Sequence, residues 1–322
     1  MMGTSQGERR TQGPAGPLWA MVLAGGDGIR LQPLTRRLYG EPRPKQFAAL
    51  IGTRSLLRQT LDRVALSIPP GRTVVVTRRA HAHYTAREVS GPGGPTVLAQ
   101  PADRGTAAGV LFPAHWIERQ HPGAVVAVFP SDHFILEEAA FMAHVAEVAT
   151  GVARSADEIV LLGAQPTVAD PEYGWIEPGE NLGWAAGSPV RTVRRFLEKP
   201  SRETAKACLE GGWLWNTFIL VAPVGALVEA GRRYLPELHD RLTRLRPFLG
   251  TTHERWAIEQ AYALAPKASF SRAVLEPCPP NLAVSRLPAV TWSDWGAPGR
   301  VVQSLEQLGV APPWLPTRDR SA

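Results

Sequence analysis

The sequence predicts an α/β protein, a three-layer α/β/α sandwich built around a mostly parallel, mixed sheet. Two observations lead to this prediction. Short apolar segments recur without strict alternation of polar and apolar residues, which is typical of strands covered on both faces. Segments with apolar residues at helical spacing separate them, and this order is typical of strands joined by crossover helices.

The first half of the chain provides most of this alternation. The segment LWAMVLA at 18–24 is predicted to be a buried strand that ends in a glycine-rich turn. Leu57, Leu61 and Val64 share one face of a helix expected over 55–66. Further strands are expected at 73–77, 96–100, 124–133 and 158–164, and further helices at 105–120 and around 141–148.

After residue 165 the pattern becomes mixed, because the apolar segments carry polar ends. Sheets of this class bind ligands at the carboxyl ends of their strands, so we expect functional residues at such ends. Strands are expected at 173–179, 191–200 and 213–223, and helices at 201–211, 223–233 and 254–264.

The 322 residues divide into a main domain at 18–300, a tail at 1–17 and a C-terminal segment at 301–322. The tail is polar and rich in Gly and Pro, and we expect it to be disordered. The C-terminal segment is expected to form a short helix and a loose Pro-rich end. No apolar run reaches the roughly 18 residues that cross a bilayer, and no signal peptide or disulfide framework is evident. We therefore expect a cytoplasmic protein without a membrane partner.

The net charge of +6 does not by itself predict nucleic-acid binding. The 35 Lys and Arg residues are spread along the chain and face 29 Asp and Glu residues, without a basic run that contains aromatic residues. An arginine-rich surface explains the net charge, and polyanionic small substrates explain a local excess. We expect no nucleic-acid partner.

The segment AGGDGIRLQPLT at 24–35 directly follows the first predicted strand. Its glycines let the backbone bend tightly and turn N–H groups toward an anion. Arg30 and the later Lys45, in the segment PKQF, add the positive charge that stabilises departing pyrophosphate. The alternative is a tight turn that binds no ligand.

Two other phosphate-binding motifs are excluded. Arg30 stands where a dinucleotide-binding fingerprint needs its third glycine, and no acidic residue closes a second strand about 20 residues further on. The GK[ST] sequence of a P-loop does not occur. A dehydrogenase with a dinucleotide fold is therefore not expected.

Together, AGGDGIRLQPLT and PKQF resemble the sugar nucleotidyltransferase family, and most of all its bacterial mannose-1-phosphate guanylyltransferases, also called GDP-mannose pyrophosphorylases. The resemblance implies the nucleotide-diphospho-sugar transferase type of α/β/α sandwich, with a nucleotidyltransferase catalytic domain over 18–300. Since the chain ends soon after Arg300, we expect no appended isomerase domain. Further family-like segments follow in order: QPADRGTAAG (100–109), FPSDH (129–133), YGWIEPG (173–179), FLEKP (196–200), WLWNTF (213–218) and WSDWG (292–296).

Two aspartates are candidates for a magnesium site. Magnesium binds carboxylate and phosphate oxygens, and the resemblance assigns it to Asp132 and Asp294. The alternative for both aspartates is ordinary turn or cap chemistry. The pair His81 and His83 lies beside arginines on a predicted surface helix, and we interpret it as solvated rather than as metal ligands.

The resemblance implies that the glycine-rich loop and the segment starting at Gln100 surround the base and ribose. Gln100 offers both a donor and an acceptor to a base edge. Thr106 has an alternative role as the cap of the helix that begins there. The implied nucleotide-binding residues are Ala24, Gly25, Gly26, Gly28, Arg30, Gln100, Arg104, Gly105 and Thr106.

The resemblance also implies that Gly174, Glu198, Lys199 and Asn216 bind the sugar phosphate. Glu198 can accept hydrogen bonds from sugar hydroxyls, and Lys199 can neutralise the phosphate. Gly174 lets the backbone approach the ring, and Asn216 can both donate and accept. The alternative for Glu198 and Lys199 is an ordinary solvated charge pair.

The sequence departs from the common family pattern in two places. The loop between Thr35 and Pro44 is longer, which bears on how far Lys45 can reach. The segment WNTF at 215–218 replaces a more usual WNSG-like form at the sugar end.

The reaction implied by the resemblance is attack of a hexose-1-phosphate on the α-phosphorus of a nucleoside triphosphate, which yields a nucleotide-sugar and pyrophosphate. Arg30, Lys45 and Asp132 are the implied catalytic residues, Mg²⁺ is the cofactor, and mannose-1-phosphate and GTP are the substrates, as in GDP-mannose biosynthesis. Alternatives are the same chemistry with a heptose or glucose phosphate or another nucleotide, and a nucleotide-sugar-binding homologue without catalysis. The oligomeric state stays open, with a homodimer as one alternative.

Overall fold

The computed structural model describes residues 16–89, 91–155, 157–183 and 189–315. The predicted N-terminal tail lies outside these residues except for positions 16 and 17, and the end of the C-terminal segment, 316–322, lies outside them too. None of the helices in the described part of the chain has the length and apolar character needed to span a membrane.

Strands and helices follow one another along the chain largely as the sequence predicts. The strands are β1 (Leu18–Ala24), β2 (Thr73–Arg78), β3 (Thr96–Gln100), β4 (Val125–Pro130), β5 (Phe134–Ile135), β6 (Ile159–Ala164), β7 (Gly174–Asn181), β8 (Val190–Glu198), β9 (Leu214–Pro223), β10 (Leu282–Arg286) and β11 (Trp292–Ser293). The α-helices are α1 (Gln32–Tyr39), α2 (Leu56–Ala65), α3 (Ala82–Glu88), α4 (Gly105–Gln120), α5 (Glu138–Val152), α6 (Arg202–Glu210), α7 (Val224–Tyr234), α8 (Pro236–Leu245), α9 (Glu254–Leu264) and α10 (Pro298–Gln307).

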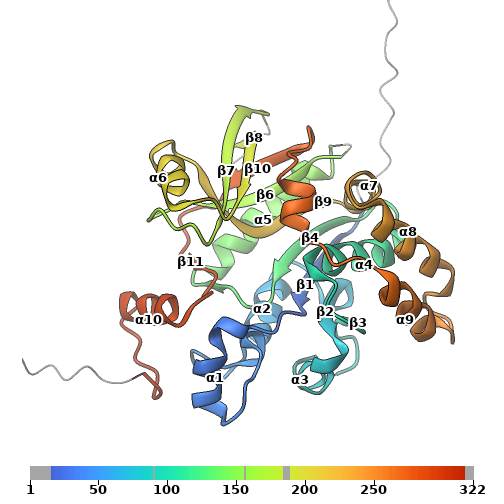
Figure 1. Cartoon of the computed structure of the whole chain (residues 1–322), viewed down its shortest axis with the longest axis horizontal. Helices are drawn as coiled ribbons and strands as arrows, with labels where there is room; N and C mark the ends of the chain where they lie inside the picture. Colours follow the sequence, from blue (N-terminus) through green and yellow to red (C-terminus); the bar gives the residue numbers. More distant parts are fainter. Residues whose placement is uncertain (1–15, 90, 156, 184–188, 316–322) are drawn as a thin grey trace, which may run out of the picture.

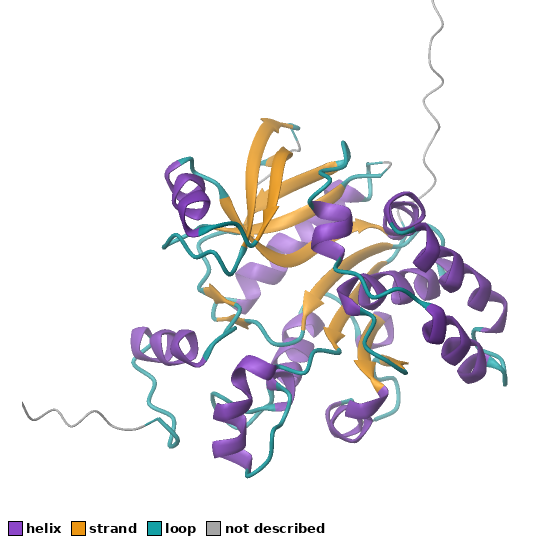
Figure 2. Ribbon diagram, viewed as in Figure 1, coloured by secondary structure: helices purple, strands orange, loops and turns teal. Residues whose placement is uncertain are grey.

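Within the described residues, nine strands form one mixed sheet in the order β3-β2-β1-β4-β9-β6-β10-β8-β7 (Figures 1 and 2). The strands β3, β2, β1 and β4 run parallel to one another. β9 is antiparallel to β4 and β6, and its first residues also pair with β7. β7 pairs directly with β9, and it is also connected to β9 through the successive pairings with β8, β10 and β6. This half of the sheet is therefore closed.

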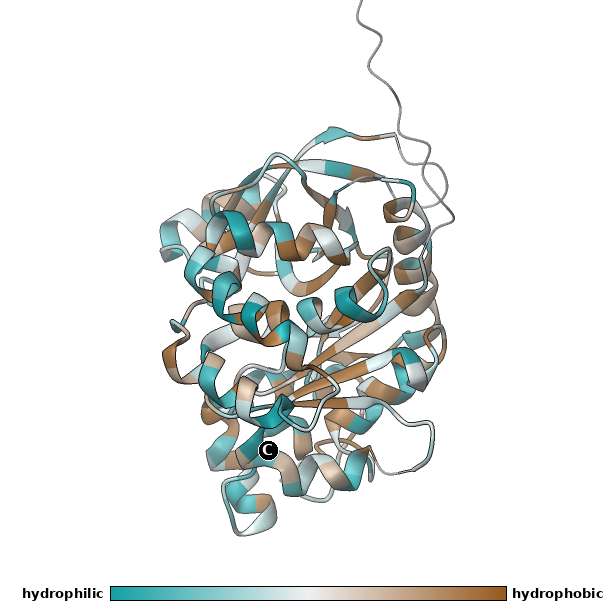
Figure 3. Ribbon diagram, turned by 90° about the vertical axis from the view of Figure 1, so that its right-hand side faces the viewer, coloured by the Kyte–Doolittle hydropathy of each residue, from teal (hydrophilic) through white to brown (hydrophobic). Residues whose placement is uncertain are grey.

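Helices cover both faces of the sheet. Alternate side chains of β1 point to opposite faces, so that Trp19 and Met21 join one apolar cluster and Ala20 and Val22 join another. The first cluster includes side chains of α4, α7, α8 and α9, and the second includes side chains of α2 and α5. The central strands are largely brown in Figure 3, the colour of apolar residues. The predicted three-layer sandwich with a mixed sheet is confirmed.

Several elements were not predicted, namely α1, α8, β10 and the short pairing of β5 with β11. α1 falls in the long loop before Lys45, has a proline in its first turn and ends at Gly40 with φ of 75°. Proline at the start and glycine after the end are the usual limits of a helix. Sequence reasoning missed α1 because few apolar residues recur along it, and its only buried residue is Thr35.

A third and smaller apolar cluster joins α10 to the segment around Lys45. Leu31, Leu50 and Trp295 belong to it together with Val301 and Leu305 of α10. The helix α10 crosses the boundary drawn at residue 300. It therefore packs against the part of the molecule that contains the glycine-rich loop.

Candidate active site

Two adjoining cavities lie at the carboxyl ends of β1 to β4, the edge at which sheets of this type bind ligands. Their volumes are about 330 Å³ and about 350 Å³, and both are lined by Asp103 and Asp132. Of the predicted residues, the first cavity is lined by Gly25, Gly26, Gln100, Gly105, Thr106 and Asp132, and the second by Gly28, Arg30, Lys45 and Asp132.

The glycine-rich loop runs past both cavities and is held by Gln46 of the segment PKQF. Gln46 Nε2 donates to the carbonyl oxygens of Ala24 at 2.9 Å and Gly26 at 2.8 Å. At Gly28, φ is 60°, and an added Cβ would lie 2.7 Å from the backbone nitrogen of Lys45. Glycine at 28 therefore allows the loop to pack directly against Lys45.

Lys45 lines the second cavity although its side chain is almost fully buried. Its Nζ lies 3.0 Å from Asp132 Oδ2 and also donates to the carbonyl oxygens of Asp294 and Trp295. A lysine ammonium has three N–H donors, so these three contacts fix its position. The long loop before Lys45 does not prevent Lys45 from reaching Asp132, because the helix α1 occupies part of this loop.

Arg30 also lines the second cavity, and its side chain is exposed to solvent. Its Nη1 lies 3.1 Å from Glu172 Oε2, and more than half of each side chain is exposed to solvent. Exposed ion pairs of this kind stabilise a protein little. A polyphosphate in the cavity can therefore compete with Glu172 for the Arg30 guanidinium.

The predicted base-binding residues Gln100 and Thr106 line the first cavity and are held by the second half of the chain. Gln100 Oε1 accepts a hydrogen bond from the Tyr262 hydroxyl at 3.0 Å, and its Nε2 lies on the side of Gly25. Thr106 Oγ1 accepts from the Phe270 backbone nitrogen at 2.9 Å, and the first backbone N–H of α4, that of Gly105, donates to Asp103 Oδ1 at 2.9 Å. The alternative role of Thr106 as a helix cap is therefore wrong.

Arg104 is the one predicted nucleotide-binding arginine whose guanidinium is turned elsewhere. It donates to the carbonyl oxygens of Tyr262 at 2.8 Å and Ala263 at 3.0 Å, at the end of α9. Carbonyl groups at the end of a helix lack intrahelical donors, which explains the attraction. Arg104 is not among the residues that line either cavity, whereas Arg78 lines the first.

The interpretation of His81 as a solvated side chain is wrong. His81 is only 5% exposed, and its Nε2 lies 3.1 Å from Arg78 Nη2 and 3.3 Å from Asp27 Oδ1. Burial, and then the charge of Arg78, lower the pKa of His81 to about 4. Arg78 also pairs with Asp27. His83, by contrast, is exposed as expected.

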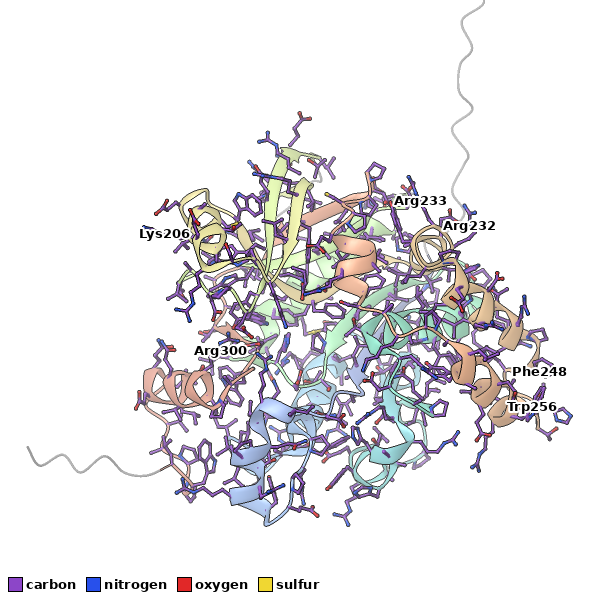
Figure 4. All side chains as sticks on the ribbon, viewed as in Figure 1. Lys206, Arg232, Arg233, Phe248, Trp256 and Arg300 are labelled. Atoms are coloured by element: carbon purple, nitrogen blue, oxygen red, sulfur yellow. The ribbon has the colours of Figure 1, made fainter. Side chains whose placement is uncertain are left out.

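Asp294 lies at the centre of a polar cluster next to Lys45. Its Oδ1 accepts from the Tyr173 hydroxyl at 2.8 Å and from Arg300 Nη1 at 2.8 Å, and its Oδ2 lies 3.1 Å from the same nitrogen. Arg300, labelled in Figure 4, also contacts Asp170 Oδ2 at 2.6 Å and lies over the Tyr173 ring. Burial alone raises the pKa of the Asp294 carboxyl, but His133, Arg300, Tyr173 and Lys45 lower it below its usual value.

The two predicted metal ligands fit magnesium to different degrees. Magnesium is usually held by one or two carboxylates together with phosphates and water. Asp132 fits this role, because it lines both cavities and its side chain is 30% exposed. Asp294 has the right donor atoms, but Arg300 competes with a metal for them. Among the described residues, no three His, Cys, Asp or Glu side chains gather into a metal site.

The predicted sugar residues meet through the register of three strands. Gly174 of β7 pairs with Glu198 of β8 on one side and with Asn216 of β9 on the other. A Cβ at Gly174 would lie 3.0 Å from Glu198 Oε2 and 3.1 Å from Asn216 Cβ. Glycine at 174 therefore lets Glu198 and Asn216 lie close to the backbone of β7, although neither of the two cavities is lined by these residues.

Glu198 and Lys199 differ in their surroundings. Burial raises the pKa of the Glu198 carboxyl above its usual value, although the charge of Lys199 opposes the change. Lys199 is exposed, has φ of 53° and donates its backbone N–H to the Tyr173 carbonyl oxygen at 3.2 Å. The alternative of an ordinary solvated charge pair therefore describes Lys199, which is exposed, better than Glu198, which is half-buried.

Sequence reasoning missed some residues of the site, among them Arg78, Arg300 and Phe218, which also lines the first cavity. Arg78 could have been found, because it closes a predicted strand at its carboxyl end. Arg300 gave no signal, since its role depends on contacts between distant segments. Phe218 ends the segment WNTF, which departs from the common family form, but its positive φ and its place on the cavity wall could not be predicted from that departure.

The chain is similar to known proteins over most of its length. A family model described as nucleotidyl transferase matches residues 19–302. The chain is 30% identical over 293 residues to the xanthan biosynthesis protein XanB of Xanthomonas campestris pv. campestris strain B100, covering 90% of the chain and 60% of that protein. It is 29% identical over 286 residues to mannose-1-phosphate guanylyltransferase of Escherichia coli K12, covering 87% of the chain and 58% of that protein. The chain thus spans about 60% of the length of these curated relatives.

Solved structures give the same result. One described as mannose-1-phosphate geranyltransferase from Thermus thermophilus is 30% identical, with a TM-score of 0.77 over 92% of this chain and 80% of that one. A putative glucose-1-phosphate thymidylyltransferase from Bacillus anthracis, 16% identical with a TM-score of 0.54 over 90% of this chain and 94% of that one, shares the fold. Since the family model covers most of the chain, from the glycine-rich loop to α10, the protein belongs to the nucleotidyl transferase family.

Proposed function

We propose that the protein joins a sugar-1-phosphate to a nucleoside triphosphate and releases pyrophosphate, with mannose-1-phosphate and GTP as its substrates. One observation carries the proposal. The Tyr173 hydroxyl donates to Asp294, whose carbonyl oxygen accepts from Lys45, which in turn contacts Asp132. Because Tyr173 directly precedes Gly174, this series of contacts connects the predicted nucleotide site to the predicted sugar site.

In this proposal the protein supplies binding and charge rather than a nucleophile. The phosphate oxygen of the sugar phosphate is already anionic and attacks the α-phosphorus in line with the departing pyrophosphate. The glycine-rich loop presents backbone N–H groups to the triphosphate, and Lys45 and Arg30 offset the charge that develops. Holding the two polyanions in line is the main task of the site.

Asp132 would hold magnesium, with Asp294 as a second ligand once Arg300 releases it. When bound, the metal would neutralise phosphate charge and help to orient the triphosphate. Lys45 contacts one oxygen of Asp132 and so fixes the direction of that carboxylate in the absence of substrate.

The choice of guanine and mannose is supported by the relatives' names, because several curated relatives are called mannose-1-phosphate guanylyltransferase. The same site chemistry would serve a heptose or glucose phosphate or another nucleotide. Specificity depends on a few hydrogen bonds and on pocket shape.

A second candidate is a homologue that binds nucleotide-sugars without catalysis. The ion pair between Arg300 and Asp294 favours it, because this pair neutralises one of the two predicted metal ligands. The position of Lys45 against Asp132 favours the enzyme.

The test is pyrophosphate release by the purified full chain with Mg²⁺ across a grid of nucleoside triphosphates and sugar-1-phosphates. We expect release to be fastest with GTP and mannose-1-phosphate and to stop with EDTA. A maximum elsewhere in the grid would keep the chemistry and change the substrates. No release from folded protein that still binds a nucleotide-sugar would favour the second candidate.

A further inference from the structure

Phe218 has a backbone conformation that is unfavourable for a bulky side chain. Its φ is 59°, in the left-handed region, where a residue with a Cβ is strained. Such strain persists only where the surrounding structure enforces it, and it is often found at functional sites. The non-glycine residues with positive φ in the described part of the chain are Lys199, Phe218, Cys278 and Trp295.

A bulge in β9 enforces this conformation. Leu220 pairs with Leu161 of β6 and Asn216 pairs with Gly163, so that residues 217–219 lie opposite Leu162 alone. Extra residues of this kind turn a side chain away from the regular alternation of a strand.

Side chains on either side of Phe218 hold the bulge in place. Asn216 Oδ1 accepts from the Phe218 backbone N–H at 3.0 Å. Thr217 Oγ1 donates to the Leu162 carbonyl oxygen and accepts from the Ile219 N–H at 3.1 Å. These three hydrogen bonds offset the strain at Phe218. In a regular strand, pairing with the neighbouring strand would satisfy the same backbone groups, and these side-chain hydrogen bonds would not be needed.

The bulge places the Phe218 side chain on the wall of the 330 Å³ cavity. Val128 of β4 pairs with Leu220, which puts Phe218 level with the end of β4, just before Asp132. Its ring meets Phe270 edge to face, with the ring centres 6.3 Å apart. Phe270 is the residue whose backbone N–H holds Thr106.

The walls of this cavity suit a nucleoside better than a phosphate. Leu23, Val76 and Phe218 give it apolar surface, and Gln100 gives it a polar edge. Lys45 and Arg30 line the neighbouring cavity, and Arg78, which lines this one, is paired with Asp27. A flat base with polar edges fits apolar walls combined with a small number of hydrogen-bonding groups.

We propose that Phe218 is a nucleoside-binding residue: its ring forms an apolar wall of the nucleotide cavity and contacts the nucleoside of the bound triphosphate. This inference rests on the proposed function. Since Asn216 belongs to the sugar cluster, the same bulge that directs Phe218 also separates the nucleoside from the sugar phosphate. The strained conformation of Phe218 therefore helps to define the boundary between the binding positions of the two substrates.

The experiment measures the dissociation constants of GTP, ATP, UTP and dTTP by calorimetry, with Mg²⁺ and without sugar phosphate, so that no turnover occurs. Phe218→Leu removes the aromatic face and keeps a Cβ at the strained position, whereas Phe218→Gly removes both. Cys278→Gly is the matched control, because it also relieves a positive φ, at a residue that does not line this cavity. Thermal unfolding verifies that each variant is folded.

We expect both Phe218 variants to bind GTP about tenfold more weakly, the size of effect that loss of one base–aromatic contact gives, and to lose affinity for the other three nucleotides by a similar factor, because every base has a face that can contact an aromatic ring. Cys278→Gly should bind like the wild type. Wild-type GTP affinity in Phe218→Leu would overturn the inference, even if Phe218→Gly failed to fold. If the wild type bound none of the four nucleotides, the proposed function would fail first, and the inference with it.

Discussion

The proposed nucleotide side of the site and its proposed sugar side are built in different ways. On the nucleotide side, the glycine-rich loop, Arg78, Gln100 and Asp132 each lie at or just after the end of a parallel strand. On the sugar side, Gly174, Glu198 and Asn216 lie in strands and meet through antiparallel register. The first arrangement depends on short contiguous segments, and the second depends on the pairing of strands that are distant in sequence.

This difference affects what a mutation does. A loop residue on the nucleotide side holds a charge or a backbone group in one place, so its loss should reduce the rate. A strand residue on the sugar side sets the positions of its neighbours' side chains, so its replacement should reduce affinity for one substrate. Four substitutions test this distinction, and the largest effect is expected on the nucleotide side.

The largest effect is expected from Lys45→Ala. The variant loses the buried ammonium that contacts Asp132 and two carbonyl oxygens, and turnover should fall by about 100-fold or more. The fold should survive, because the partly exposed Asp132 carboxylate stays hydrated. Pyrophosphate release and thermal unfolding check both points, with the exposed Lys206→Ala (Figure 4) as control. Near-normal turnover in Lys45→Ala would remove Lys45 from the mechanism.

Gly28→Ala should have the next largest effect. A Cβ there would meet the backbone of Lys45 at 2.7 Å in a residue with positive φ, so the loop and Lys45 must separate. Displacement by about 1 Å costs about 100-fold in rate when positioning dominates catalysis. We expect kcat to fall while the KM for the sugar phosphate changes little. A variant with normal kcat would show that the loop does not position Lys45.

Gly174→Ala should affect the other substrate. Its Cβ would press on Glu198 Oε2 and Asn216 Cβ, raising the KM for the sugar phosphate about tenfold and leaving that for the triphosphate unchanged. The control is Gly71→Ala, where a Cβ would meet nothing within 4 Å. Equal changes in both KM values would contradict the separation of the two sides.

The smallest effect is expected from Arg300→Gln, at the junction between the two sides. Without the guanidinium, Asp294 is free to bind a metal, and half-maximal activity should need about fivefold less Mg²⁺. Arg232→Gln, at an exposed ion pair far from the site (Figure 4), serves as the control. An unchanged or increased Mg²⁺ requirement would argue against competition between Arg300 and the metal.

The same contrast explains what the sequence could predict. Segments such as AGGDGIR and FPSDH carry their information locally, because strand ends and glycine turns are visible in a single stretch of sequence. The strand and helix alternation, and with it the sandwich, followed from apolar periodicity. The sugar residues were identified by resemblance alone, since no local signal reveals that Gly174 lies between Glu198 and Asn216.

Other features could not be found in the sequence because they depend on tertiary contacts. His81 contacts Arg78 at the end of β2 and Asp27 of the glycine-rich loop, two segments that are distant in sequence. Arg104 faces the end of α9 rather than the cavity, and Arg300 reaches Asp294 from α10. The partners of a long, flexible cationic side chain depend on which groups the folded backbone brings within its reach.

The central claim is that both substrates meet at one site and react directly with each other. Incorporation of labelled pyrophosphate into GTP tests it, measured with Mg²⁺ in the presence and absence of GDP-mannose. Direct in-line transfer predicts label in GTP only when GDP-mannose is present, because the reverse reaction then has both of its substrates. Label in GTP without any sugar compound would instead indicate a nucleotidylated protein, and no label under either condition would contradict the proposed reaction.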